Sequence, residues 1–213
     1  MMFLAALTAV QWLAAGVAHA QRGDYLSAEP AFGEACRLDP GLPDACYYVG
    51  RARYFLDRYD DALVPLRQSH ASDRRQPPGR ALTAIAQALE ALGRPQEAEA
   101  GFLQAIDAAP LSAEPPVKYG LFLLRQGRAA AAVAPLEAAA KLDPASREAP
   151  LELGRALYQL GKLEQALPHL RRGAKLDPKS APAHTMLSKI YRRLGQDADA
   201  DRHLAILRSL PTP

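Results

Sequence analysis

Small, apolar and proline residues recur along the chain at a fixed interval. Pro110, Pro144 and Pro178 follow one another with a spacing of 34 residues, and Pro40 stands two such periods plus two residues before Pro110. We number each segment so that this proline is position 32. A repeat of this length indicates a helical or strand unit that buries its apolar face against its neighbours. The pattern predicts an all-α chain of about six helix-turn-helix units, which span residues 9–42, 43–78, 79–112, 113–146, 147–180 and 181–213.

Three positions of the unit carry the same kind of residue throughout. Position 8 is small, position 20 is alanine in all six units, and position 24 is phenylalanine or leucine. We expect the small residues to let the two helices of a unit approach closely, while the large residue fills the space beyond them. The residues at position 8 are Gly16, Gly50, Ala86, Gly120, Gly154 and Ser188, and those at position 24 are Phe32, Leu66, Phe102, Leu136, Leu170 and Leu204.

Position 15 separates the two helices of each unit. It is glycine in every unit except the second, where it is Asp57. Glycine accepts the left-handed backbone conformation that ends a helix, and the proline at position 32 prevents the second helix from continuing. Each unit is therefore predicted to be a helical hairpin.

This arrangement resembles the tetratricopeptide repeat family, and the resemblance covers residues 9–213. It implies a right-handed superhelical solenoid whose concave face, lined by the first helix of each unit, binds a peptide or protein segment, and it implies no catalysis. The second unit departs most from the family pattern, because Arg53 stands at the usually apolar position 11 and Arg74 replaces the proline. Its joint to the third unit, residues 74–78, includes the two additional residues and could change the bend of the solenoid.

The first twenty residues have more than one interpretation. Residues 1–8 form an apolar N-terminal extension, and residues 18–20 have the small-residue pattern of a signal-peptide cleavage site. Against a signal, Trp12 and Gly16 fit positions 4 and 8 of the repeat, and the first eight residues carry no charged side chain. We expect an uncleaved first repeat helix in the cytoplasm. Export after cleavage of residues 1–20, or a membrane anchor, are the alternatives.

The groove positions of this first helix support the alternatives. Val10, Leu13, Ala14 and Val17 are apolar where other units place polar side chains. A helix that is apolar all round is typical of a membrane span, an interface or a signal. Membrane contact is expected only through residues 1–20, since no later apolar run is long enough for a span.

Two cysteines lie symmetrically about the turn at Gly41. Cys36 is position 28 of the first unit, and Cys46 is position 4 of the second. Antiparallel neighbouring helices could bring them within bridging distance, so the pair is either a disulfide or two buried thiols. A disulfide would indicate an oxidising compartment. No metal site is expected, because neither cysteine has a histidine or cysteine neighbour at metal-ligand spacing.

The charge balance and the residue inventory exclude several functions. The net charge of +3, from 26 basic and 23 acidic residues, is too small to indicate nucleic-acid binding. The chain has no asparagine, so the asparagine-containing clamp with which some tetratricopeptide repeats hold a C-terminal carboxylate is not expected in its usual form. No nucleophile elbow, phosphate loop or metal motif is present, and we expect no catalysis and no cofactor. The histidines share no repeat position that would gather them: His19, His70, His169, His184 and His203.

Positions 2, 5, 6, 9, 12 and 13 of each first helix are expected to face the groove. In the second unit they bring together Tyr47, Tyr48, Arg51, Tyr54 and Phe55, an aromatic cluster with one guanidinium that could hold an apolar anchor of a partner. Basic residues outnumber acidic ones at these positions, which favours an acidic or carboxylate-bearing ligand. The other candidate groove residues are Arg80, Gln87, Lys118, Arg125, Arg155, Tyr158, Lys189, Arg192 and Arg193.

Two functions fit such an array. The first is a scaffold or adaptor that binds an acidic peptide or protein segment. The alternative is a structural assembly element that associates through its apolar terminal helices in the cell envelope. For the last helix, Leu204, Leu207 and Leu210 need cover from the preceding helix or from a partner, so an oligomer is also conceivable.

Overall fold

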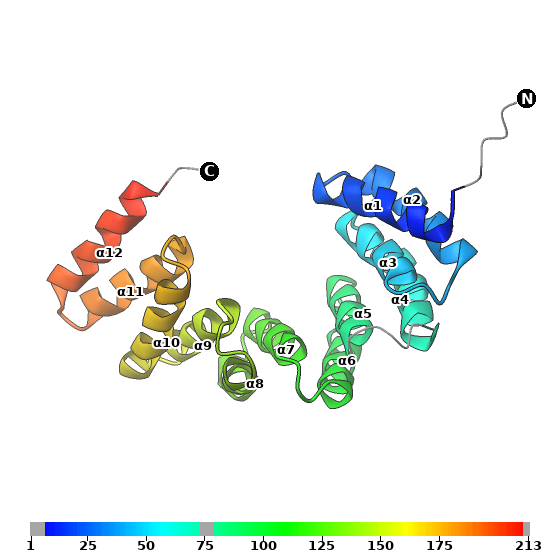
Figure 1. The fold of residues 1–213 in the computed structure, drawn as a ribbon. Coiled ribbons are helices and arrows are strands. Elements are labelled where there is room, and N and C mark those ends of the chain that lie inside the picture. Colours follow the sequence, from blue (N-terminus) through cyan, green and yellow to red (C-terminus); the bar gives the residue numbers. More distant parts are fainter. Residues whose placement is uncertain (1–6, 73–78, 211–213) are drawn as a thin grey trace, which may run out of the picture. The chain divides into compact units, whose positions relative to one another are not determined.

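The computed structural model of the protein describes residues 7–72 and 79–210. Within those residues it contains twelve α-helices and no strands (Figure 1). The joint at residues 74–78 and most of the N-terminal extension lie outside the described residues. The helices are α1 (Ala9–Gln21), α2 (Tyr25–Leu38), α3 (Ala45–Phe55), α4 (Tyr59–Ser72), α5 (Arg80–Ala91), α6 (Pro95–Ala108), α7 (Glu114–Arg125), α8 (Ala129–Leu142), α9 (Glu148–Gln159), α10 (Leu163–Leu176), α11 (Ala181–Arg193) and α12 (Asp197–Ser209).

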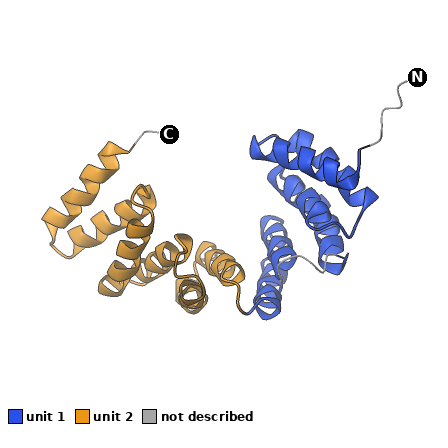
Figure 2. Ribbon diagram, viewed as in Figure 1, with its two compact units in different colours: residues 1–110 blue, residues 111–213 orange. Residues whose placement is uncertain are grey.

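The chain divides into two compact units, residues 1–110 and 111–213 (Figure 2). In each unit every helix packs against the next one along the chain. The first helices of neighbouring repeats also touch, α3 with α5 in the first unit and α7 with α9 and α9 with α11 in the second. This stacking of helical hairpins confirms the predicted all-α repeat fold. We call the side formed by α1, α3 and α5, or by α7, α9 and α11, the groove face of its unit.

In four of the hairpins, the residue at position 8 lies directly against the side chain at position 24. A Cβ atom added to Gly154 of α9 would stand only 2.5 Å from Cγ of Leu170 in α10. In the third repeat position 8 is Ala86, and the facing helix has Gly101, where an added Cβ would lie 3.1 Å from the Ala86 Cβ. The space between the two helices therefore admits one side chain and not two. The glycine pairs of the same kind are Gly16 with Phe32, Gly50 with Leu66 and Gly120 with Leu136.

The turn after each first helix needs a left-handed residue. The five glycines at position 15 have φ between 71° and 76°, and Asp57 adopts the same conformation with φ of 57°. The Asp57 carboxylate accepts a hydrogen bond of 2.5 Å from the Tyr59 hydroxyl. Because a Cβ atom disfavours this backbone region, Asp57 is a less stable choice there than glycine.

Helix α1 packs as the first helix of a repeat. It begins with a capping box, in which the Thr8 hydroxyl accepts from the Gln11 amide while the Gln11 side chain accepts from the Thr8 amide. Leu13 and Val17 pack against the buried cluster of α2 and α3. Both side chains are half-buried, so the cluster covers part of each. Val10 is 61% exposed. No helix in residues 7–72 or 79–210 combines the length and the apolar character that a membrane span needs.

A disulfide joins Cys36 of α2 to Cys46 of α3. The two Cα atoms lie 4.8 Å apart, across the loop that connects the first repeat to the second. This bond fixes the start of α3 next to the end of α2.

At the other end of the chain, α12 packs against α11. Leu204, Leu207 and Leu210 are half-buried there rather than fully exposed. His184 and His203 meet across this helix pair, with their Nδ1 atoms 2.9 Å apart. The expectation that no repeat geometry gathers histidines is wrong for these two, because they lie on facing sides of one hairpin. Burial, and then the charge of His184, hold the pKa of His203 below its usual value.

Candidate partner-binding site

A cavity of about 300 Å³ opens on the groove face of residues 1–110. Its walls come from α1, α2, α3 and α5, and most of the lining side chains are aromatic. We call it the aromatic pocket. It is lined by Ala20, Tyr25, Phe32, Tyr47, Tyr48, Arg51, Ala52, Phe55 and Arg80.

The aromatic walls of the pocket are fixed by ring-to-ring packing. Phe55 stacks on Tyr25 with a centroid distance of 4.5 Å, and Tyr48 stacks on Phe32 at 5.1 Å. Tyr47 meets the edge of Tyr48 at 5.6 Å. Such offset and edge contacts are favourable ring geometries, so the pocket walls are rigid before any ligand arrives.

Arg80 closes one side of the pocket with its charge already neutralised. Its guanidinium carbon lies 4.0 Å from the centroid of the Tyr47 ring, and its Nη1 donates to Asp44 Oδ1 at 2.5 Å. Nη2 donates to the Tyr48 hydroxyl at 3.5 Å. Burial alone would lower the pKa of Arg80, but the Tyr48 hydrogen bond and the electrostatic interactions with Tyr47 and Asp44 outweigh it and raise the pKa above its usual value.

Arg51 has a different set of partners. Its Nη1 donates to the Gln87 side-chain oxygen at 3.0 Å. Its guanidinium carbon lies 4.9 Å from the Phe55 centroid and 5.2 Å from that of Tyr54. In the described part of the chain, Arg51 therefore contacts an amide and two rings and makes no ion pair with a carboxylate.

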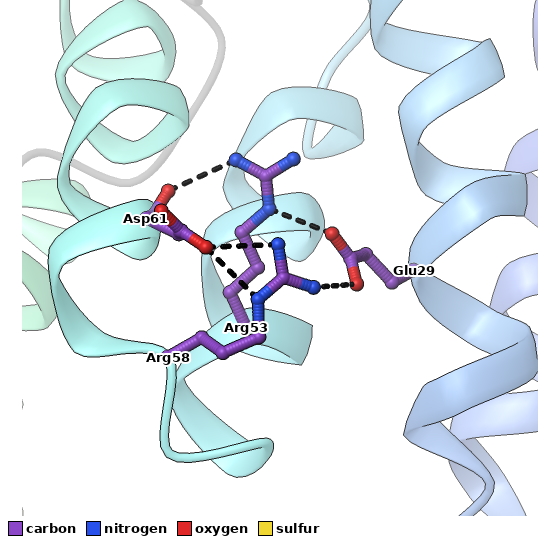
Figure 3. Close-up of polar contacts among 4 residues, drawn as sticks. All are labelled: Glu29, Arg53, Arg58 and Asp61. Atoms are coloured by element: carbon purple, nitrogen blue, oxygen red, sulfur yellow. Dashed lines mark hydrogen bonds and ion pairs between the residues drawn. The ribbon is translucent and has the colours of Figure 1, made fainter.

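A polar network attaches the pocket-bearing helix α3 to α2. Glu29 of α2 accepts from Arg53 Nε at 2.8 Å and from Arg58 Nη1 at 2.6 Å. Arg53 also donates to the main-chain oxygen of Asp61, and Arg58 forms an ion pair of 2.9 Å with the Asp61 carboxylate (Figure 3). The charged residue at the usually apolar position 11 is thus paired, and it fixes the junction between the first two repeats.

The groove face of residues 111–213 carries paired charges. Lys118 lies 2.9 Å from a Glu148 oxygen, and Arg155 Nε lies 2.9 Å from Glu152 Oε2. The Arg155 contact is a pairing of charges only, because the N–H does not point at the oxygen and neither atom completes a hydrogen bond. Glu152 is only 9% exposed. Its burial raises the pKa of the carboxyl, although the charges of Arg155, Arg125 and Lys118 oppose the shift.

The remaining candidate groove residues divide into three groups. The guanidinium of Arg193 lies 5.7 Å from the Tyr158 ring, so these two meet across neighbouring repeats. Arg192 instead turns toward α12, where it pairs with Asp201 at 2.8 Å. Lys189 and Arg125 are exposed.

Sequence reasoning missed part of the pocket wall. Tyr25 and Phe32 come from α2, a second helix of a repeat, whereas the groove was assigned to first helices alone. A signal was present, because Tyr25 and Tyr59 are aromatic at the same repeat position; Tyr25 stacks on Phe55 of α3, and Tyr59 meets Tyr54 of α3 edge to face.

Stacked helical hairpins of nearly constant length define an α-helical repeat protein. Models of the tetratricopeptide repeat match residues 83–147 and 123–190. The chain belongs to the tetratricopeptide repeat family. Proteins of this family are generally non-enzymatic scaffolds for protein interactions.

Solved structures share the fold at low sequence identity. PilF of Pseudomonas aeruginosa has a TM-score of 0.77 and 21% identity, with 96% of this chain and 93% of that chain covered. MamA of Desulfovibrio magneticus has a TM-score of 0.66 and 22% identity, with 79% and 94% covered. YrrB, described as a TPR protein with an unusual peptide-binding site, has a TM-score of 0.55 and 18% identity, with 82% and 89% covered. No curated protein shows a significant sequence match to the chain.

Proposed function

We propose that this interaction scaffold binds an acidic segment of a partner protein on the groove face of residues 1–110, with one apolar side chain of the segment in the aromatic pocket. The observation that carries the proposal is the pocket itself. Its volume of about 300 Å³ suits one large side chain rather than a folded surface. Rigid aromatic walls lose little entropy on binding, and buried aromatic anchors dominate the binding energy of many interfaces.

The charge of the pocket supports an acidic partner. Several of the basic groove residues are neutralised by carboxylates within the chain, as Arg80 is by Asp44 and Lys118 is by Glu148. Arg51 keeps its charge at the pocket wall and has no carboxylate partner among residues 7–72 and 79–210. Complementary charge at an interface improves specificity and the rate of association.

Assembly through apolar terminal helices has less support. Leu13 and Val17 of α1 and the leucines of α12 are at least partly covered within the chain, which leaves Val10 as the main apolar side chain exposed on α1. The Cys36–Cys46 disulfide supports the exported alternative for this scaffold, because disulfides persist in oxidising compartments.

A peptide library selected against the folded full-length protein tests the proposal. We expect the selected peptides to share an apolar residue and acidic character. Phe55→Ala removes a pocket wall whose side chain is 47% exposed, so the variant should fold. It should weaken the binding of a selected peptide by about tenfold or more in calorimetry.

Val64→Ala is the matched control, because Val64 belongs to the same repeat, is 69% exposed and does not line the pocket. It should leave the affinity unchanged, and circular dichroism should show that both variants keep their helix content. Equal affinity of the selected peptides for Phe55→Ala and the unmodified chain would refute the proposal.

A further inference from the structure

We infer, resting on the proposed function, that the aromatic pocket binds two groups of the partner segment at once. These are an apolar side chain and a carboxylate on the same residue or on the residue next to it. Among the described residues, two guanidinium groups line the cavity, those of Arg51 and Arg80. Their surroundings differ, and this difference assigns the carboxylate to Arg51.

Arg80 already holds a carboxylate. Its Nη1 donates to Asp44, its Nη2 donates to the Tyr48 hydroxyl, and the Tyr47 ring covers the face of the guanidinium. Asp44 is set in this place by the left-handed backbone at the start of α3, with φ of 68°, directly beside the disulfide-bonded Cys46. A ligand carboxylate would have to displace Asp44 to reach Arg80.

Arg51 is positioned but not saturated. A guanidinium carries five N–H donors, and within the described chain one nitrogen of Arg51 donates to Gln87. The rings of Tyr54 and Phe55 hold the group from the side. A planar guanidinium fixed in this way presents its remaining donors to a carboxylate without a further loss of side-chain freedom.

The distance between the two groups follows from the size of the cavity. Arg51 is part of the wall of the same pocket of about 300 Å³ that receives the apolar side chain. Consecutive Cα atoms are about 3.8 Å apart, so a carboxylate two or more residues away would in general lie outside this space. Two sources remain, a C-terminal α-carboxylate or the side chain of an adjacent aspartate or glutamate.

Nuclear magnetic resonance titrations with three small probes test this inference. The probes are N-acetyl-phenylalanine with its free carboxylate, the corresponding amide, and the amide of N-acetyl-aspartyl-phenylalanine. We expect the amide to shift the same pocket resonances as the free acid but to bind about tenfold more weakly. The dipeptide amide distinguishes the sources: affinity near that of the free acid indicates a neighbouring side-chain carboxylate, and affinity near that of the amide indicates a C-terminal one.

Arg51→Gln should make the acid and the amide bind equally. Arg51→Lys should keep part of the affinity difference between the acid and the amide, because lysine keeps the positive charge but lacks the paired N–H donors of the guanidinium. Arg171→Gln is the matched control, since Arg171 also lies over a tyrosine ring but belongs to the other unit and is not a candidate groove residue. It should leave the difference unchanged. Equal binding of all three probes in the pocket of the unmodified chain would overturn the carboxylate inference and leave the proposed function standing. If no probe shifts the pocket resonances, both fail.

Discussion

Gly154 sits where the structure leaves room for hydrogen only, and Gly154→Ala tests the packing rule of the repeat. The added Cβ would stand 2.5 Å from Cγ and 2.6 Å from Cδ2 of Leu170. Leu170 is fully buried between α9, α10 and their neighbours, so it has no free space to enter. The two helices would have to separate or Leu170 would have to leave its preferred rotamer.

The expected magnitude combines two opposing effects. Overpacking a buried site costs about 1–3 kcal/mol, and the depth of this overlap places it at the upper end. Alanine is a better helix former than glycine by about 1 kcal/mol. We therefore expect Gly154→Ala to reduce the free energy of unfolding by about 2 kcal/mol, which corresponds to a fall of about 4–8 °C in the melting temperature of a chain of this size.

Gly173→Ala provides the matched control in the same unit. Gly173 is an interior residue of α10, and an added Cβ would meet Leu151 atoms no nearer than 3.6 Å, an ordinary contact. This variant should gain about 0.5–1 kcal/mol from helix propensity alone. Thermal and urea unfolding by circular dichroism measures both, and amide hydrogen exchange shows whether α9 and α10 open first. A Gly154→Ala protein as stable as the unmodified chain would refute the packing rule.

Three further outcomes follow from single residues. Asp57→Gly should raise the free energy of unfolding by about 0.5 kcal/mol in urea unfolding, since glycine accepts the left-handed conformation and this gain exceeds the lost Tyr59 contact; a loss of stability would contradict this. Reduction of the Cys36–Cys46 disulfide should lower the free energy of unfolding by about 2–3 kcal/mol, because the bond closes a loop with a sequence separation of 10. An unchanged melting temperature under reductant would count against this stabilisation. Burial raises the pKa of Glu152 in the folded protein above the ordinary 4.5. The native protein should therefore lose stability as the pH rises from the unfolded-state pKa through the raised folded-state pKa, whereas Glu152→Gln should not. Parallel profiles of unfolding free energy against pH for the two proteins would exclude this effect.

The repeat register could be deduced from the sequence because each packing position tolerates one size of side chain. The contact between Gly154 and Leu170 leaves no space for a larger residue at position 8, so the spacing of small and large residues is enough to place the helices. The left-handed turn at Asp57 follows from the same register, although the residue type alone does not reveal it.

The site was less accessible from sequence because it depends on side-chain partners that the register does not specify. Arg80 and Arg51 stand at groove positions of neighbouring repeats, yet only the structure shows that Asp44 neutralises the first and not the second. The α2 wall of the pocket arises because the first helix of one repeat packs against the second helix of the repeat before it. Leu13 packs against the buried cluster of α2 and α3 for the same reason.

The central claim is that a partner segment is held in the aromatic pocket of residues 1–110. A crystal structure of the full-length protein with a library-selected peptide tests it most directly. We expect an apolar side chain of the peptide against Phe55 and Tyr47, with a carboxylate on Arg51. A peptide bound on the second helices of the repeats, with the aromatic pocket empty, would contradict it.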